Sequence, residues 1–389
     1  MYALNYDALW FSLPLAFAES CAYIGSLLFT FNLWKVKDEP QQSPPFKIAE
    51  CVSDTDEDRP ISVDVFFPSY DEEPELVKLS ILDAQKIRYP HPVDIKIFIL
   101  DDGKRPEMQA MAEDMGVGYI TREGNIGFKA GNLRNAMERT SGDFVVICDA
   151  DTRPFPSILE NTLGYFRDPS VAWVQTPQWF FDLPEGERLP DLLERKLGKW
   201  SKGLGRAVER VYGPVTFGDD PFVNDPQMFY DVIQRRRNWV NASFCCGAGS
   251  IHRREAVMEA ALRAYAEQIT KEQDLVEKEI RRLTKEKQVD ASVSENLRNE
   301  ILFDTEFTPY KFHVSEDLYT SIVLHSDRER NWRSVMHPKV ESKMLSPQDL
   351  QTWTVQRFKY SGGSIDIFMN DNPISVSYTH LTLPTIIWV

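Results

Sequence analysis

The sequence predicts an α/β fold in which a mostly parallel, doubly wound sheet is covered by helices. Four apolar runs rich in β-branched and aromatic residues are typical of buried strands: 63–67, 95–100, 144–148 and 172–175. Helical patterns alternate with them at 75–86, 107–115 and 130–138. Such alternation is typical of a parallel sheet. Two of the strands end in carboxylates, Asp101-Asp102 and Asp149-Ala150-Asp151, and ligands bind at the carboxyl ends of such strands.

An apolar segment at 9–34 precedes the sheet and predicts one transmembrane helix. At ~1.5 Å per residue it is long enough for a ~30 Å hydrocarbon core. Trp10 and Trp34 bracket it as interfacial anchors, and the lysines that follow place its C-terminal side in the cytoplasm. Glu19 requires a partner helix, a protonated acid or a polar path within the membrane. A buried helix of a soluble protein is the alternative.

The remaining chain divides by composition into a linker, one large domain and a C-terminal region. The predicted divisions are a transmembrane region at 1–37, a Pro- and Ser-rich linker at 38–60, the α/β domain at 61–345, an interfacial helix region at 346–372 and a tail at 373–389. Two stretches within the domain, 183–220 and 257–302, look inserted.

The second insertion and the tail have patterns of their own. Leu262, Ile269, Val276 and Leu283 recur every seven residues, which predicts an amphipathic helix that packs on its own domain or on a partner. The tail resembles translated adapter sequence, so we expect it to be non-native and the natural chain to continue past 372.

Composition excludes several classes of protein. The net charge of −15 argues against nucleic acid as the main partner, because phosphate backbones require clustered Lys and Arg. The five cysteines are scattered, which favours a reducing compartment and gives neither a disulfide framework nor a zinc spacing. A P-loop and a GxGxxG fingerprint are both absent from the sequence.

The residues around the strand ends predict a phosphate-handling site. Asp149 and Asp151 offer hard oxygen ligands for Mg²⁺ or Mn²⁺, which would bridge the phosphates of a nucleotide-sugar. A solvated acidic turn is the alternative for this pair. Four further motifs accompany it: Lys129-Ala130-Gly131-Asn132, a small-residue turn at 243–249, Ser315-Glu316-Asp317 before a helix, and Gln356-Arg357-Phe358-Lys359-Tyr360. In the last motif Gln356, Lys359 and Tyr360 share one helix face. Alone, each has an ordinary structural explanation.

Taken in order, these motifs resemble the processive family-2 glycosyltransferases, in particular the bacterial cellulose synthase type. The matching segments are Pro68-Ser69-Tyr70-Asp71-Glu72, Asp101-Asp102-Gly103, 129–132, Asp149 with Asp151, 174–178, 244–247 and 315–317. The resemblance implies a GT-A-type fold and direct displacement that inverts an α-linked donor to a β-linkage. The match departs where the family's Gln-x-x-Arg-Trp becomes 356–360 of this chain. Lys359 loses the bidentate geometry of Arg, and Tyr360 offers a smaller platform than Trp.

The resemblance also implies a role for each site residue. Tyr70, Glu72 and Asp102 would hold uridine and ribose. Asp149 and Asp151 would hold the nucleotide and Mg²⁺ or Mn²⁺, with Asp151 as the direct ligand. The diphosphate would be bound by Lys129, Gln356, Arg357 and Lys359, and the acceptor end would be lined by Cys246 and Tyr360. Asp317 would be the general base.

The leading interpretation is a membrane-bound processive transferase that uses UDP-glucose to extend a β-glucan. Its partners would be a UDP-sugar donor, a polysaccharide acceptor, the membrane and accessory subunits of a synthase complex. Its catalytic domain would lie on the cytoplasmic side of a bacterial inner membrane. Alternatives are a transferase that makes another β-linked polysaccharide or a glycolipid, and a catalytically dead scaffold whose 257–302 helix recruits partners.

Overall fold

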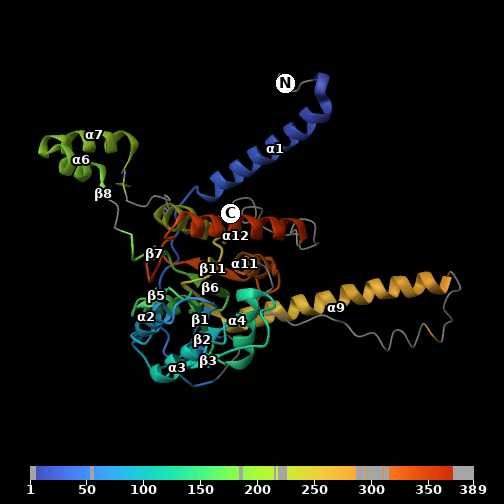
Figure 1. The fold of residues 1–389 in the computed structure, drawn as a ribbon. Helices are drawn as coiled ribbons and strands as arrows, with labels where there is room; N and C mark the ends of the chain where they lie inside the picture. Colours follow the sequence, from blue (N-terminus) through green and yellow to red (C-terminus); the bar gives the residue numbers. More distant parts are fainter. Residues whose placement is uncertain are drawn as a thin grey trace.

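A seven-stranded, mostly parallel sheet forms the centre of the protein (Figure 1). The computed structural model describes residues 6–52, 57–183, 187–213, 216–217, 226–285, 293, 310 and 315–370. The strand order is β11-β6-β10-β4-β1-β2-β3, and within the described residues only β10 runs antiparallel to its neighbours. The strands are β1 (Ile61–Ser69), β2 (Val93–Asp101), β3 (Gly118–Ile120), β4 (Phe144–Ile147), β6 (Val171–Gln175), β10 (Ser250–Arg253) and β11 (Arg333–Met336). This architecture confirms the predicted fold class.

Helices cover both faces of the sheet because the side chains of β1 alternate between two apolar layers. Val63, Val65 and Phe67 face α2 (Pro74–Ala84), α3 (Pro106–Met115) and the short α5 (Ile158–Thr162). Phe66 faces the opposite layer, which contains α4 (Phe128–Arg139) and the start of α9 (Arg254–Lys285). The period of two along β1 therefore produces the two layers.

Smaller elements extend the C-terminal edge of the sheet. A three-stranded sheet joins β5 (Arg153–Pro154), β12 (Ser342–Met344) and β7 (Gln178–Phe180). The helix α11 (Glu316–Ser326) and the long α12 (Leu350–Asn370) share an apolar cluster that includes Leu318, Ile322 and Ile367. This packing places α12 across the start of α11. In Figure 1, α12 lies above the sheet.

Two helical segments project from the body (Figure 1). The first comprises β8 (Glu187–Arg188), α6 (Leu189–Leu197), α7 (Lys202–Tyr212) and β9 (Thr216–Phe217), and falls in the predicted insertion at 183–220. The second is α9, which lies in the insertion predicted at 257–302. Within α9, Leu262 of the predicted heptad repeat is 59% exposed, whereas Ile280, which lies outside that repeat, is buried. Residues 286–302 apart from Val293, and the tail predicted at 373–389, lie outside the described residues.

The N-terminal helix meets the domain through its C-terminal end. Within the described chain, residues 6–32, which include α1 (Leu9–Asn32), form the one helix long and apolar enough to cross a membrane, properties that signal sequences share. Trp239 donates from Nε1 to the carbonyl of Asn32, 2.8 Å away, and its ring lies edge-on to Phe31. The segment that follows is also held: Asp38 pairs with Arg235 at 2.5 Å. Within the described part of the predicted linker at 38–60, residues 48–50 form a short 3₁₀ turn, and Ile48 and Cys51 are buried in the core.

Candidate active site

The acidic residues of the site follow the ends of β1, β2 and β4 and the N-terminus of α11. Because β1, β2 and β4 are parallel neighbours, their carboxyl ends meet at one edge of the sheet. Asp149 and Asp151 follow β4, and Glu316 and Asp317 begin α11. Sequence spacing alone could not place α11 there; its packing against the 243–250 turn and α12 does.

Lys129 connects the carboxylates of β4 with those of α11. Its Nζ lies 2.5 Å from Oδ1 of Asp149 and 3.9 Å from Oε1 of Glu316. Burial alone would lower the pKa of this ammonium, but the charges of Asp149, Glu316 and Asp317 outweigh that effect and raise it. Lys129 is therefore a permanent cation among three carboxyl groups.

Gly247 marks the point where the base candidate approaches this cation. A Cβ added at Gly247 would lie 3.5 Å from both Oδ2 of Asp317 and Nζ of Lys129, so at most twice that distance separates these two atoms. Gly247 has φ +79°, a left-handed conformation that glycine adopts without strain. Gly247 therefore leaves the turn without a side chain at the point where it passes Oδ2 of Asp317 and Nζ of Lys129.

The environment of α11 suits Asp317 to accept a proton. Burial raises the pKa of both Asp317 and Glu316; the charge of Asp317 adds to the rise at Glu316, and the charge of Asp149 adds to the rise at Asp317, because like charges repel. Oδ1 of Asp317 accepts from the N–H of Leu318 at 2.8 Å, which partly opposes that rise. Oδ2 is the atom that faces Gly247 and Lys129. A carboxylate with a raised pKa is a stronger base than an ordinary surface Asp.

Asp151 lies apart from the Lys129 cluster but shares the same sheet edge. Its Oδ2 accepts from the N–H of Leu345 at 3.1 Å. Burial, together with smaller contributions from the charges of Asp149 and Glu72, raises the pKa of Asp151 to about 7. Among the described residues Asp151 forms no ion pair with a Lys or Arg side chain, whereas Asp149 is paired with Lys129.

Asp149 and Asp151 fit a divalent cation that is completed by substrate. Within the described residues, no group of three His, Cys, Asp or Glu side chains is close enough to hold a metal alone. Mg²⁺ is commonly bound by one or two carboxylates together with waters and substrate phosphates. The uncompensated burial of Asp151 is consistent with such a site.

The residues predicted for the nucleoside are held by protein partners. Asp102 forms two 2.7 Å hydrogen bonds with the guanidinium of Arg122. Glu72 accepts from the hydroxyl of Ser69 and from the N–H of Tyr70, while the side chain of Tyr70 is exposed. Arg122 thereby fixes the Asp102 carboxylate at the end of β2.

The residues predicted on α12 divide between the cluster and the surface. The hydroxyl end of Tyr360 is desolvated enough to raise its pKa to about 12, and Asp149 and Asp317 contribute, although 48% of the residue stays exposed. Gln356 is partly buried and Lys359 is exposed. Among the described residues, no ion pair joins Lys359 to the carboxylates. Arg357 lies over the ring of Trp353 at 5.6 Å.

A set of amides and one hydroxyl, which the sequence analysis did not single out, fixes the turn that carries Cys246. Gln175 accepts from the N–H of Cys246 at 2.7 Å and donates to the carbonyl of Ala248 at 2.9 Å. Gln234 donates to Sγ of Cys246 at 3.0 Å. Ser321 of α11 accepts from the N–H of Cys245 at 2.8 Å. Gln175 lies in the segment 174–178 that resembles the family, and this match was the one sequence feature that could have identified it as a site residue.

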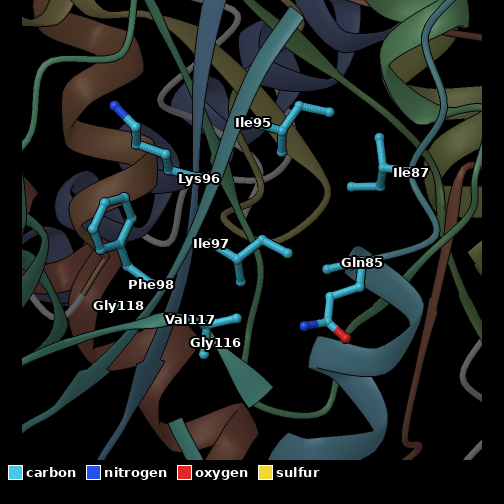
Figure 2. A pocket seen from close by; sticks show the side chains of 10 residues that line it. Gln85, Ile87, Ile95, Lys96, Ile97, Phe98, Gly116, Val117 and Gly118 are labelled. Carbon is cyan, nitrogen blue, oxygen red and sulfur yellow. The ribbon is translucent and has the colours of Figure 1, made fainter. Parts of the chain in front are cut away.

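A separate cavity of about 460 Å³ lies beside the first half of β2 (Figure 2). Figure 2 shows Ile95 and Ile97 on the side of Ile87 and Gln85, whereas Lys96 and Phe98 point the other way. Its lining contains none of the predicted site residues. The candidate active site is the acidic edge of the sheet and not this cavity.

Comparison with known proteins gives a consistent result. A glycosyl transferase family 2 model matches residues 64–260. The chain is 35% identical over 199 residues to the UDP-forming cellulose synthase catalytic subunit of Pseudomonas fluorescens (strain SBW25). This alignment covers 51% of this chain and 23% of that protein. It is 29% identical over 339 residues to the protein of that name in Komagataeibacter sucrofermentans. This alignment covers 86% of this chain and 34% of that protein. The chain thus spans about a third or less of the length of these two relatives.

Solved structures resemble the chain at lower similarity. Mannosyltransferase PcManGT from Pyrobaculum calidifontis, in complex with GDP-Man and Mn²⁺, is 13% identical with a TM-score of 0.48 and covers 95% of this chain and 83% of that one. The family match and the observed sheet together confirm the predicted GT-A-type α/β fold.

Proposed function

This chain belongs to glycosyl transferase family 2, and on that premise we propose that it transfers a sugar from a UDP-sugar to a growing β-linked glucan with inversion at the anomeric carbon. The proposal rests chiefly on the position of Lys129 between Asp149 and the pair Glu316 and Asp317. The names of the relatives, UDP-forming cellulose synthase catalytic subunits, favour UDP-glucose as the donor. The proximity of Asp149, Lys129 and the pair Glu316 and Asp317 at one edge of the sheet supports a transferase over an inert scaffold.

In the proposed reaction, Asp317 accepts the proton of the acceptor hydroxyl as that oxygen attacks the anomeric carbon. The bond between the anomeric carbon and the diphosphate oxygen breaks, and UDP leaves with the bonding electrons. Oδ2 of Asp317 is the accepting atom, because Oδ1 is occupied by the N–H of Leu318. A single displacement on an α-linked donor gives a β-linkage.

The proposed donor site holds the diphosphate among opposite charges. Lys129 would exchange part of its contact with Asp149 for a phosphate oxygen. Asp149 and Asp151 would hold Mg²⁺ or Mn²⁺, which when bound neutralises the charge that develops on the leaving diphosphate. Gln356 and Lys359 would approach from α12, and Tyr70, Glu72 and Asp102 would line the uridine and ribose end.

The proposed acceptor site lies beside the 243–249 turn. Cys246 and Tyr360 would contact the terminal sugar, with Tyr360 as an aromatic platform. We further propose that α1 anchors the enzyme in a bacterial inner membrane with the catalytic domain in the cytoplasm. Processive synthesis and accessory subunits of a synthase complex belong to the same proposal.

Asp317→Asn tests the proposed base. It keeps the size of the side chain and removes its ability to take a proton, so transfer should fall by roughly 10²–10⁴-fold while UDP binding is retained. Asp114→Asn, an exposed carboxylate on α3, is the matched control and should keep full activity. Normal synthesis by Asp317→Asn would remove the base assignment.

The donor is tested by incubating membranes that contain the full chain with separately labelled UDP-sugars. Preferential incorporation of glucose into a β-glucanase-sensitive polymer is expected. Incorporation of another sugar would replace the proposed product with another β-linked polysaccharide or a glycolipid. Absence of incorporation from every donor, with UDP binding also absent, would favour the scaffold.

A further inference from the structure

The helical pair α6 and α7, joined by a turn at 198–201, carries an unusual surface for this acidic chain. Residues 187–213 contain seven Lys and Arg residues and four Asp and Glu residues, whereas the whole chain has a net charge of −15. In Figure 1 the pair stands off the body beyond α12, on the side where α1 also emerges. It contributes none of the residues placed in the candidate active site.

All four acids of this pair are neutralised inside it. Glu209 pairs with Arg188 at 2.5 Å and Glu187 with Arg195 at 2.8 Å. Lys202 lies 2.9 Å from Asp191 and 2.5 Å from Glu194.

Four exposed cations form no ion pair within the described residues: Lys196, Lys199, Arg206 and Arg210. Every acid at 187–213 is already paired with another cation, so within that range these four are available to an anion from outside.

Apolar side chains are exposed on the same pair. Leu197 and Leu204 are each 55% exposed, and Trp200 and Val211 are each 75% exposed. Leu204 and Val211 lie seven residues apart on α7 and therefore on one face of the helix. Exposed apolar residues flanked by Lys and Arg, with a Trp among them, are typical of helices that lie in the headgroup region of a bilayer.

We infer that α6 and α7 dock on the surface of a bilayer that contains anionic lipids. The four free cations pair with lipid phosphates, while Trp200, Leu197 and Leu204 enter the interface. A second copy of the same surface is disfavoured because its unpaired charges have the same sign. Other helices of the protein also expose apolar side chains: α12 exposes Phe358 and Met369, and α1 is exposed along most of its length.

This docking goes beyond the proposed transferase activity and does not depend on it. The test uses the full chain reconstituted in vesicles of phosphatidylcholine, with or without one-third phosphatidylglycerol, and in detergent. Trypsin cleavage after Lys199 and Arg206 is followed by mass spectrometry. Anionic vesicles should slow that cleavage by about tenfold, because juxtamembrane cations bind anionic surfaces. Cleavage after Arg281, an exposed site on α9, should stay unchanged.

Two variants and a salt series complete the test. The double variant Lys199→Glu and Arg206→Glu, probed at Lys196 and Arg210, should lose the protection, whereas Lys278→Glu on α9 should keep it. Rising salt should reverse the protection of the unmodified chain, since screening weakens surface electrostatics.

Equal cleavage in both kinds of vesicle would overturn the inference. Protection that grows with protein concentration in detergent would also overturn it, in favour of self-association. Vesicle flotation reports membrane attachment of the chain separately, and sugar transfer is assayed separately. Failure of the docking is therefore distinguishable from failure of the proposed function.

Discussion

Nζ of Lys129 lies 2.5 Å from Oδ1 of Asp149, and the same atom is 3.9 Å from Glu316 on a helix that begins more than 160 residues later in the chain. One cation therefore connects the strand that would bind the donor with the helix that would supply the base. Removing that cation leaves three carboxyl groups without compensation in a partly buried site.

Replacing Lys129 should affect both stability and chemistry. Lys129→Met should lower the free energy of unfolding by on the order of 2–4 kcal/mol at pH 8, because uncompensated buried charges are costly. The loss should shrink at acid pH, where the carboxyl groups protonate. Urea unfolding at several pH values measures this. Lys129→Arg, which keeps the charge, is the control and should recover most of the stability.

The raised pKa of Asp317 predicts the pH dependence of transfer. A base must be deprotonated, so kcat/KM should rise with pH through a midpoint above the ordinary value of 3.8 for an Asp. The midpoint belongs to the coupled pair, and Glu316→Gln should move it downward because one repelling charge is removed. A pH profile of kcat/KM that is flat from pH 4 to 8 would contradict the assignment.

Asp151 predicts a metal-dependent stability. Its pKa is raised to about 7, so its contribution to stability is fully present below the ordinary pKa near 3.8 and is lost as pH rises through about 7. Without divalent ions, Asp151→Asn should therefore stabilise the fold above pH 7, by at most about 4 kcal/mol.

Melting temperatures with EDTA and with added Mg²⁺ test this prediction. Added Mg²⁺ should stabilise the unmodified chain above pH 7 and have little effect on the variant. An equal response of both proteins to Mg²⁺ would argue against Asp151 as a ligand.

Two adjacent glycines of α12 provide a matched pair of substitutions. A Cβ at Gly363 would lie 2.0 Å from Oγ of Ser315, whereas a Cβ at Gly362 would meet nothing within 4 Å. Gly362→Ala should stabilise the helix by roughly 0.5–1 kcal/mol. Gly363→Ala should displace Ser315, next to Glu316 and Asp317, and lower transfer. Equal activity of the two variants would show that α12 does not constrain the base.

Gln175 predicts the cost of losing the hydrogen bonds that hold the 243–249 turn, which we propose as the acceptor site. Gln175→Leu keeps the volume but leaves the partly buried N–H of Cys246 and the buried carbonyl of Ala248 without this partner. We expect about 2–4 kcal/mol of destabilisation and a higher KM for the acceptor. Thermal unfolding and acceptor titration measure these effects. Gln109→Leu, on the exposed surface of α3, should change neither.

The parallel strands β1, β2, β4 and β6 were predictable because they are apolar, whereas the parallel strand β11 was not predicted. The runs at 63–67 and 95–100 lie within β1 and β2, and the alternation of strands and helices gave the fold class. Strand β10 was missed because it contains His252 and Arg253. Arg253 is buried there through hydrogen bonds to the carbonyls of Cys51, Phe166 and Val171, which no local pattern encodes.

In the site, too, features set by local sequence were predictable, whereas contacts between distant segments were not. Each acidic segment could be located from its strand or helix, and the family resemblance joined them. The Lys129 bridge, the Arg122 partner of Asp102 and the clamp by Gln175 depend on distances across the fold and could not be deduced from sequence. The roles assigned to the site residues remain predictions.

The junction between α1 and the domain limits how a soluble version of this protein should be prepared. Deleting residues through 38 would remove two contacts of Trp239, the hydrogen bond to the carbonyl of Asn32 and the ring contact with Phe31. It would also remove the ion pair between Arg235 and Asp38. Trp239 follows the segment whose Gln234 holds Cys246. Expression boundaries should therefore retain the last turn of α1, because a cut placed by hydropathy alone would remove contacts of Trp239 and Arg235, which follow the segment that holds Cys246.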